Sequence, residues 1–266
     1  MSSDVLDNLV VGLSRQSRVI VALTIREVRL RNSKHAFGQL FDLLEAVVFI
    51  VVHWIIFSFL GRHLLVGDSL LLFIATGIFP VLFFRTMTIR AATAIEASKA
   101  VTAIPSVEPI DYSIARTFVE FASFTILFVA FFAMIDAFGL SRFAIPYNPS
   151  AVVEFMAAIF FFSLGIGLIN SFLTFLFPLW KFIWGMFSRV QIFFSAVFFI
   201  PEYMPPQIKH ILSFNPIMHF VSLFRSGFYP TYPMHLFSRE YMWGWSATVL
   251  LLGLALERTL RNQRSH

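Results

Sequence analysis

The longest uncharged stretch of this chain, Phe155–Trp180, holds 26 residues between Glu154 and Lys181. As a helix it would extend about 39 Å, which exceeds the roughly 30 Å hydrocarbon core of a bilayer. Charged residues make up only 13% of the chain, whereas ordinary soluble domains carry about 25%. The sequence therefore predicts a protein whose main solvent is lipid.

Five further charge-poor runs predict additional spans of the membrane, although several reach the length of a span only with their flanks. They are Ala46–Gly61, Ser69–Phe84, Phe121–Ile135, Val190–Pro201 and Tyr241–Leu256. We therefore expect an all-α polytopic membrane protein with six transmembrane helices. Residues 37–266 would form this membrane domain, and residues 1–36 would precede it as a separate helix.

The basic residues predict the orientation of the spans. With six spans both termini lie on one side, and that side receives 15 of the 20 Lys and Arg residues. The other side keeps Arg62, Arg142, Lys209, Arg225 and Arg239. Because cytoplasmic loops are enriched in Lys and Arg, both termini are predicted to be cytoplasmic. The net charge of +5 then reflects topology, and no nucleic-acid partner is expected.

Catalytic and metal-binding motifs are missing from the sequence. The chain has no cysteine, no Walker loop, no H-E-x-x-H and no G-x-S-x-G, and its seven His residues are scattered without ligand spacing. His53, alone in the first span, is typical of a packed or hydrogen-bonded residue. We expect no catalytic residue, no metal and no cofactor, and the polar N-terminus leaves the spans themselves as insertion signals.

The N-terminal segment 1–36 is predicted to form an amphipathic helix at the cytoplasmic face. Arg15, Arg18, Arg26 and Arg29 fall within about 80° of one another on a helical wheel. Such a helix lies in the headgroup layer with its basic stripe toward phosphates or a protein partner. Alternatively, it is a basic anchor that only fixes topology.

The segment between the second and third spans is predicted to be a short helix followed by a rigid elbow. Helix formers fill its first part, Pro105 and Pro109 interrupt it, and a new helix is expected to start at Asp111 as N-cap. Arg116 would then face Glu120 one turn further on. The alternative is that these residues merely build a tight cytoplasmic turn.

Segment 201–239, on the non-cytoplasmic side, combines six prolines with apolar pieces too short to cross a bilayer. A water-exposed loop would not be so apolar, so two short re-entrant helices are predicted, sheltered by protein because their ends expose unpaired backbone groups. An amphipathic cap on the outer leaflet is the alternative.

Three segments of the chain together resemble one family, the membrane subunits of ABC-2 type exporters that export capsular polysaccharide. The first runs from Ile25 to Arg31, with Gly38 and Glu45 after it. The second and most specific includes Gly77-Ile78-Phe79-Pro80, Arg90, Ala94-Ile95-Glu96-Ala97, Val107, Pro109-Ile110-Asp111, Ala115-Arg116 and Glu120; the third includes Pro201, Pro205, Asn215-Pro216, His219 and Arg225. The likeness covers about residues 20–260. This chain departs from the pattern at Ser222 and Glu108, where an acidic and a basic residue are usual.

The resemblance implies a homodimer that encloses a channel, in the inner membrane of a Gram-negative bacterium. Two copies of a separate ABC ATPase subunit would bind the ATP and dock beneath, and a periplasmic co-polymerase or adaptor and an outer-membrane export protein would complete the path of the polysaccharide. Helix 91–110 would couple ATP hydrolysis to the channel. The implied site residues are Glu96, Pro109, Asp111 and Arg116 for coupling, Arg26, Glu27, Arg29 and Arg31 on the interface helix, and Asn215, Pro216, His219 and Arg225 in a periplasmic gate.

Two arginines of the second span complete the predicted site. Arg85 sits about 7.5 Å inside Arg90 along a helix, and an intramembrane arginine is costly unless it meets water or an anion. The hypothesis is that both face the channel and attract an acidic polysaccharide or its lipid-phosphate end. Alternatively, both extend to cytoplasmic headgroups.

Other functions remain open at this point. An exporter of the same architecture could carry O-antigen, teichoic acid or a drug. From a different class, the chain could be a membrane-embedded enzyme or a passive structural subunit. Co-purification with a Walker-motif ATPase whose hydrolysis the chain stimulates would separate the transport functions from these.

Overall fold

The computed structural model describes residues 2–34, 36–97 and 108–264, and within them the side chains of 2–10, 13, 31–34, 36–43, 94–97, 109 and 260–264 lie outside the description. Every regular element of these residues is helical. The elements are α1 (Ser2–Lys34), α2 (Ala36–Phe59), α3 (Leu70–Ala97), α4 (Pro109–Ala137), α5 (Pro149–Leu176), α6 (Trp180–Phe194), the 3₁₀ turn η2 (Pro201–Tyr203), α7 (Pro206–Ser213), α8 (Pro216–Phe228) and α9 (Arg239–Arg264).

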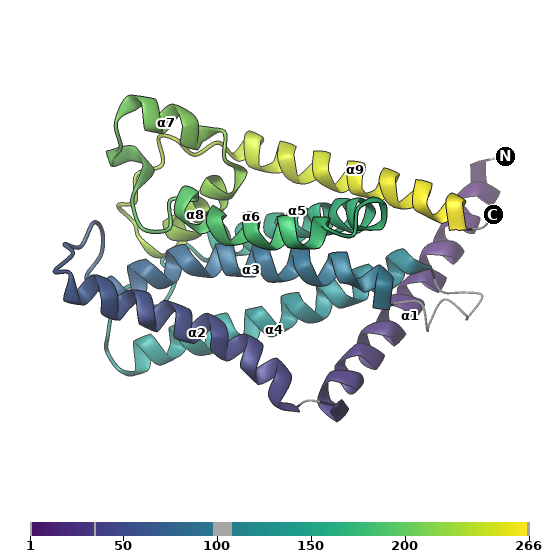
Figure 1. The fold of residues 1–266 in the computed structure, drawn as a ribbon, viewed down its shortest axis with the longest axis horizontal. Coiled ribbons are helices and arrows are strands. Elements are labelled where there is room, and N and C mark those ends of the chain that lie inside the picture. Colours follow the sequence, from purple (N-terminus) through teal and green to yellow (C-terminus); the bar gives the residue numbers. More distant parts are fainter. Residues whose placement is uncertain (1, 35, 98–107, 265–266) are drawn as a thin grey trace.

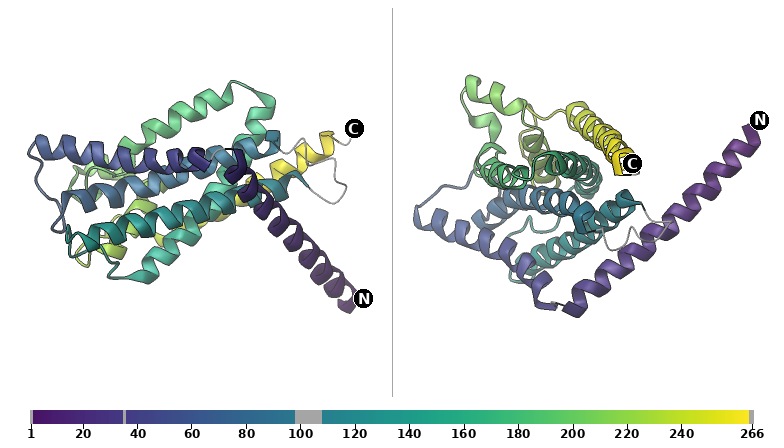
Figure 2. Two further views of the ribbon diagram at one scale, coloured as in Figure 1. Left: turned by 90° about the horizontal axis from the view of Figure 1, so that it is seen from below. Right: turned by 45° about the vertical axis from the view of Figure 1, so that its right-hand side comes forward.

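The long helices run back and forth between two ends of the molecule (Figure 1). One end, here called the terminal end, holds both ends of the drawn chain, and there α3 ends, α4 begins and α5 turns into α6 (Figure 1). At the opposite, far end lie the α2–α3 and α4–α5 connections and helices α7 and α8 (Figure 1). Helix α1 projects away from the bundle at the terminal end, as Figure 2 shows.

Three helices of the described residues are long and apolar enough to cross a membrane. These stretches are Leu70–Thr93, Ile110–Ala137 and Pro149–Leu176, and a shorter apolar stretch covers Leu44–Phe59 in α2. The helical, multi-pass architecture expected from the sequence is confirmed at this level.

Phenylalanine rings fill much of the space between the helices. Phe128 and Phe132 of α4 make a tilted contact at 4.7 Å between ring centroids, and Phe228 of α8 approaches Phe132 at the same distance. Phe224 of α8 meets Phe155 of α5 at 4.6 Å. Aromatic pairs of this kind prefer tilted or edge-to-face contact at 4.5–7 Å. They attach the short helix α8 to two long helices.

Helices α5 and α9 pack closely because glycines lie where they meet. A Cβ atom added to Gly165 would lie 2.5 Å from the backbone nitrogen of Leu250, and one added to Gly253 would lie 2.7 Å from the carbonyl oxygen of Gly165. Small residues let helix backbones approach in this way within membranes.

Helix α5, Pro149–Leu176, begins and ends earlier in the chain than the uncharged run Phe155–Trp180 that predicted it. It begins at Pro149, where the Asn148 side chain caps the first turn by accepting from the Ala151 backbone nitrogen at 3.4 Å. It ends at Leu176, because Pro178 disfavours a helical conformation for Phe177 and has no N–H to donate.

The predicted boundaries of the fifth span, Val190–Pro201, are wrong. Helix α6 covers Trp180–Phe194 instead and includes the charged residues Lys181 and Arg189. The chain leaves the helix at Ser195 and stays non-helical until η2. Absence of charge could not reveal this break, because its cause lies in side chains of other segments.

The two short helices predicted within 201–239 are present as α7 and α8. Nearly all of α8 is buried, and it packs against α3 and α5. In α7, by contrast, most residues are exposed, with Leu212 as the buried one. The apolar pieces of this segment therefore differ in role, since α8 belongs to the protein core and α7 lies over it.

Candidate functional site

Helix α1 is joined to the bundle through a buried carboxylate. Glu27 is only 4% exposed, and its two oxygens accept hydrogen bonds from the Tyr112 hydroxyl at 2.7 Å and from Arg116 Nε at 3.0 Å. Leu23 packs beside them against Tyr112 and Ala115 of α4. A buried carboxylate is tolerated only with such partners. Glu27, predicted on the interface helix, and Arg116, predicted for coupling, therefore meet in one ion pair.

The start of α4 differs from its prediction. The helix begins at Pro109, and Glu108 occupies the N-cap position that was expected for Asp111. Asp111 sits three residues into the helix, where Oδ2 accepts from the Glu108 backbone nitrogen at 3.1 Å. Its Oδ1 accepts from Gln16 Nε2 of α1, also at 3.1 Å. Pro109 is thus a first-turn proline, which suits the position because the first helical N–H has no partner in any case.

A second ion pair joins α3 to α4 nearby. Arg90 Nε lies 3.3 Å from Glu120 Oε1, and Arg116 Nη1 donates to Thr93 Oγ1 at 3.4 Å. We call Glu27, Arg90, Asp111, Arg116 and Glu120 the junction cluster. It connects α1, α3 and α4 at the terminal end through side chains only.

The structure describes only some of the other site residues that were predicted at the terminal end. Arg29 is exposed and Arg26 is half-buried. Arg31 and Glu96 belong to α1 and α3, and their side chains lie outside the described residues. The predicted helix 91–110 is not separate where it is described, since 91–97 continues α3 without a break and 98–107 lies outside the description.

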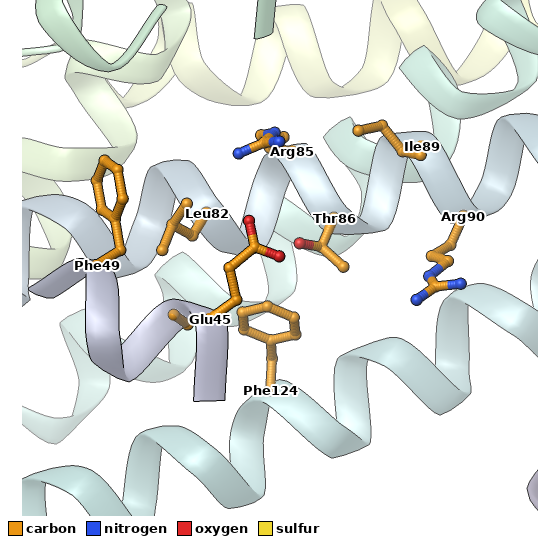
Figure 3. A pocket seen from close by; sticks show the side chains of 9 residues that line it. Glu45, Phe49, Leu82, Arg85, Thr86, Ile89, Arg90 and Phe124 are labelled. Atoms are coloured by element: carbon orange, nitrogen blue, oxygen red, sulfur yellow. The ribbon is translucent and has the colours of Figure 1, made fainter. Parts of the chain in front are cut away.

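A cavity of about 160 Å³ opens between α2, α3 and α4. Figure 3 shows Glu45 of α2 facing it from one side, with Arg85 and Arg90 of α3 at different points along the opposite wall. The two guanidinium groups point in different directions (Figure 3), because residues five apart are about 140° apart around a helix. Both arginines thus border one cavity, but Arg90 is also paired with Glu120.

At the far end, Arg225 of α8 is completely buried and holds backbone carbonyl groups. Its Nη1 donates to Ala196 O at 2.7 Å and Phe199 O at 3.1 Å, and its Nη2 donates to Val197 O at 2.5 Å and Phe73 O at 3.3 Å. Three of these oxygens belong to the break after α6. Arg225 therefore donates to carbonyls of the non-helical segment that follows α6, which have no helical partner.

Two further side chains donate hydrogen bonds to carbonyls at the end of α6 and just after it. Asn215 Nδ2 donates to Phe194 O at 2.8 Å, while its Oδ1 caps α8 by accepting from the Ile217 nitrogen at 3.0 Å. Arg62, from the α2–α3 connection, donates to Phe198 O. Every buried carbonyl needs a partner where water is scarce. We call Arg62, Asn215 and Arg225, with the carbonyls of 194–199, the carbonyl clamp.

His219 links α8 to the segments on either side of it. Its Nε2 lies 2.9 Å from Ser213 O, and the Ser238 nitrogen donates to Nδ1 at 3.1 Å. Because Nδ1 accepts, the hydrogen must be on Nε2, which defines a neutral imidazole. Pro216 is the first residue of α8. All four residues predicted for the periplasmic gate thus lie together at the far end.

Sequence reasoning missed several residues of these sites. Glu45 appeared only as a family position, and Glu120 appeared as a family position and as the i, i+4 neighbour of Arg116; the ion pair of Glu120 with Arg90 was not predicted. Gly77 was another family position, and a Cβ added there would lie 2.5 Å from Arg225 Nη2. Arg62 appeared only as a basic residue of the non-cytoplasmic side, and residues 194–199 only as part of the predicted span Val190–Pro201. Nothing predicted their pairing, since backbone acceptors are the same at every position.

Comparison with known proteins identifies relatives along nearly the whole chain. No family model matches the sequence. The chain is 28% identical to the polysialic acid transport protein KpsM of Escherichia coli over 250 residues, covering 93% of this chain and 95% of KpsM. It is 25% identical to the capsule polysaccharide export inner-membrane protein CtrC of Neisseria meningitidis serogroup B and 27% identical to BexB of Haemophilus influenzae, with 92% of each chain covered in both cases. The family likeness drawn from the sequence is thereby confirmed: this chain is a relative of the inner-membrane proteins of capsule polysaccharide export.

Proposed function

We propose that the chain is the channel-forming permease subunit of an ATP-driven ABC exporter that moves capsular polysaccharide from the cytoplasm to the periplasm. The observation that carries this is likeness over more than nine-tenths of the chain to relatives named for polysialic acid transport and capsule polysaccharide export. The names favour capsular polysaccharide over O-antigen, teichoic acid or a drug. They equally favour a transport role over that of an enzyme.

Six crossings of the membrane are proposed, made by α2, α3, α4, α5, α6 and α9. The alternation of helix ends in Figure 1 supports this count, because each connection lies at the end that a six-span path requires. Most basic residues then lie at the terminal end, which would be cytoplasmic, as would both termini. Helix α6 is the shortest of the six at 15 residues, about 22 Å. The clamped segment after it, with α8, would complete that crossing.

Helices α7 and α8 are proposed as the re-entrant pair of the periplasmic side. The burial of α8 and the contacts of Asn215 and Arg225 near its two ends support this for α8, since a re-entrant helix must be sheltered by protein. Helix α7 is included because it packs against α8. In this arrangement Asn215, Pro216, His219 and Arg225 hold the gate segment in shape.

ATP would be bound and hydrolysed by a separate ATPase subunit, two copies of which would dock at the terminal end of a homodimer. The junction cluster supports this site of action. The cluster connects α1 with α3 and α4 next to the segment proposed to contact the ATPase. Movement of α1 or of that segment would therefore be transmitted to α3 and α4. Glu96, Pro109, Asp111 and Arg116 remain the proposed coupling residues, and Arg26, Glu27, Arg29 and Arg31 those of the interface helix.

The acidic character of the cargo is proposed from Arg85 and Arg90. Arg90 is already paired with Glu120, so Arg85 is the better placed of the two to attract a phosphate or carboxylate. Export by Arg85→Gln and Arg85→Lys variants tests this role. Loss with Gln and retention with Lys supports it, and normal export with Gln contradicts it.

The direct test of the function is removal of the chain from an encapsulated host. We expect the capsular polymer to accumulate inside the cell and to disappear from the surface, with both effects reversed by a plasmid copy. The purified chain should bring down an ATPase with a Walker motif and raise its rate of ATP hydrolysis. Normal surface polymer in the deletion strain would contradict the function, and absence of any ATPase would contradict the mechanism.

A further inference from the structure

The cavity between α2, α3 and α4 changes in polarity along the bundle. Phe49 and Leu82 line it toward the far end, and its two arginines, Arg85 and Arg90, lie toward the terminal end with Thr86 and Ile89 between them (Figure 3). This order follows from the chain, because α2 runs away from the terminal end and α3 runs back to it (Figure 1). A phospholipid of the leaflet at the terminal end has the same order, with its headgroup outermost and its acyl chains deeper.

The charges facing the cavity favour a particular class of headgroup. Two guanidinium groups, Arg85 and Arg90, share it with the carboxylate of Glu45, and Arg90 is paired with Glu120 just beyond. Among these four groups positive and negative charges balance, and Arg189 of α6 adds a positive charge that acts on Arg85 from outside the lining. A purely anionic ligand would gain from Arg85 but would be repelled by Glu45, whereas a ligand with a phosphate and an ammonium group would satisfy both.

The size and surroundings of the cavity also match part of a lipid. At about 160 Å³ it is smaller than the roughly 300 Å³ at which pockets for drug-sized molecules begin, so it suits a headgroup and not a sugar chain. Leu44 and Val48 of α2, which directly precede the lining residues Glu45 and Phe49, are each 49% exposed. These apolar side chains offer a surface for the acyl chains of a molecule whose headgroup occupies the cavity.

We propose that this cavity binds the zwitterionic headgroup of an aminophospholipid from the surrounding bilayer. Arg85 holds the phosphate, and Glu45 accepts hydrogen bonds from the ammonium group. Arg90 closes the cavity on the terminal side, and Phe49, Leu82 and Phe124 contact the glycerol and the first part of the acyl chains. Binding of this kind would hold α2 against α3 and α4 at the depth of the cytoplasmic headgroups.

The experiment measures which lipid the full chain retains. The protein is purified in detergent, incubated with equal amounts of phosphatidylethanolamine, phosphatidylcholine and phosphatidylglycerol, and analysed by native mass spectrometry. Wild-type protein should retain phosphatidylethanolamine about tenfold more than either other lipid, the effect expected from one charge-assisted hydrogen bond. Glu45→Gln should remove the preference over phosphatidylcholine, whose quaternary ammonium donates no hydrogen bond. Arg85→Gln should reduce retention of all three lipids.

Three controls keep the result interpretable. Arg85→Lys keeps the charge and should retain the lipid, which separates loss of binding from loss of folding. Glu45→Asp keeps the carboxylate and should likewise retain the lipid. Arg142→Gln changes an exposed arginine at the far end and should leave the preference unchanged.

Several outcomes would overturn the inference. A wild-type preference for phosphatidylglycerol would mean that the cavity takes an anionic phosphate, such as the lipid-phosphate end of the cargo. A phosphatidylethanolamine preference that survives both Glu45→Gln and Arg85→Gln would place the lipid elsewhere, and no preference at all would remove the site. The lipid inference and the cargo role of Arg85 exclude one another at this cavity, so a preference for phosphatidylglycerol would favour the cargo role. The export function itself is measured in cells and would stand or fall separately from each of these results.

Discussion

The junction cluster at the terminal end and the carbonyl clamp at the far end both contain arginines, but they use them differently. In the junction cluster the partners are side chains of different helices, such as Glu27 of α1 for Arg116 of α4. In the clamp the partners of Arg225 are backbone carbonyls of a broken helix. Side chains can exchange partners, whereas freed carbonyls inside a membrane protein need the same donor permanently. We therefore expect movement at the terminal end and rigidity at the far end.

Replacing Arg225 by Met should have the largest effect on stability. The guanidinium is fully buried, and its loss leaves the carbonyls of Ala196, Val197 and Phe199 without a donor. The expected cost is about 3–5 kcal/mol, as for breaking other buried charged contacts. Thermal unfolding of the purified protein in detergent would measure it.

Two comparisons define how that result is interpreted. Arg225→Lys keeps the charge but cannot reach four oxygens at once, so it should recover only a minor part of the stability. Arg142→Gln, at an exposed position, should change stability by no more than about 0.5 kcal/mol. An Arg225→Met protein as stable as the wild type would show that the clamp does not hold the α6 break.

Gly77→Ala tests the carbonyl clamp by adding a methyl group beside Arg225 instead of removing the arginine. A Cβ at this position would contact Val197 O and lie 2.5 Å from Arg225 Nη2, so either the arginine or the carbonyl must move. We expect a loss of about 1–3 kcal/mol, the usual cost of overpacking. The matched control is Gly185→Ala in α6, because no atom lies within 4 Å of a Cβ there. Equal melting temperatures for the two alanine variants would argue against a tight clamp.

At the terminal end, the pairing of Glu27 with Arg116 should contribute less. A double-mutant cycle with Glu27→Gln and Arg116→Gln is expected to give a coupling of about 1–2 kcal/mol, since the two side chains are in contact and largely buried. The far-end pair Arg239–Glu154 lies at 2.7 Å, but its arginine side chain is 61% exposed, so the same cycle there should give about 0–1 kcal/mol. A larger coupling for the exposed pair would reverse the ranking.

The smallest effect should come from Asp68, which links two connections at the far end. Its oxygens accept from Ser141 Oγ at 2.5 Å and from the Arg142 nitrogen at 2.9 Å. Partial burial alone would raise the pKa of Asp68, but these hydrogen bonds outweigh it and lower the pKa below its usual value. The carboxylate therefore contributes stability that is complete above its unfolded pKa of about 3.9 and is lost as pH falls through the lowered folded pKa.

Comparing wild type with Asp68→Asn across pH 2–6 (roughly, bracketing ordinary carboxyl values) would measure this contribution. The two melting temperatures should differ at the upper end of the range and converge toward the lower end. A difference that grows on acidification would contradict the assigned hydrogen bonds.

How far the sequence could predict these regions depends on the kind of contact. The uncharged runs located five of the long helices, α2, α3, α4, α5 and α9, because an apolar run is a local property of the chain. The short helices α7 and α8 were also predictable, since each begins with a proline at its first position. The break after α6 was not, because it depends on Arg225 and Asn215, which come 20 or more residues later.

The junction cluster shows the same limit. Glu27 and Arg116 were each identified as site residues, but 89 positions separate them, and nothing in the sequence pairs them. Asp111 was correctly expected to cap a helix, yet the position was wrong because Pro109 begins the helix two residues earlier. Local chemistry was thus predictable, and the pairing of distant segments was not.

The most direct test of the account is the side of the membrane on which each end of the bundle lies. Because the chain has no cysteine, single substitutions report without background. Tyr147, in the far-end connection between α4 and α5, and Leu179, in the terminal-end connection between α5 and α6, are each 72% exposed. With a maleimide that cannot cross the inner membrane, Tyr147→Cys should be labelled in spheroplasts and Leu179→Cys only after permeabilisation. Labelling of both cysteines from the same side would contradict the six-span arrangement and the export path built on it.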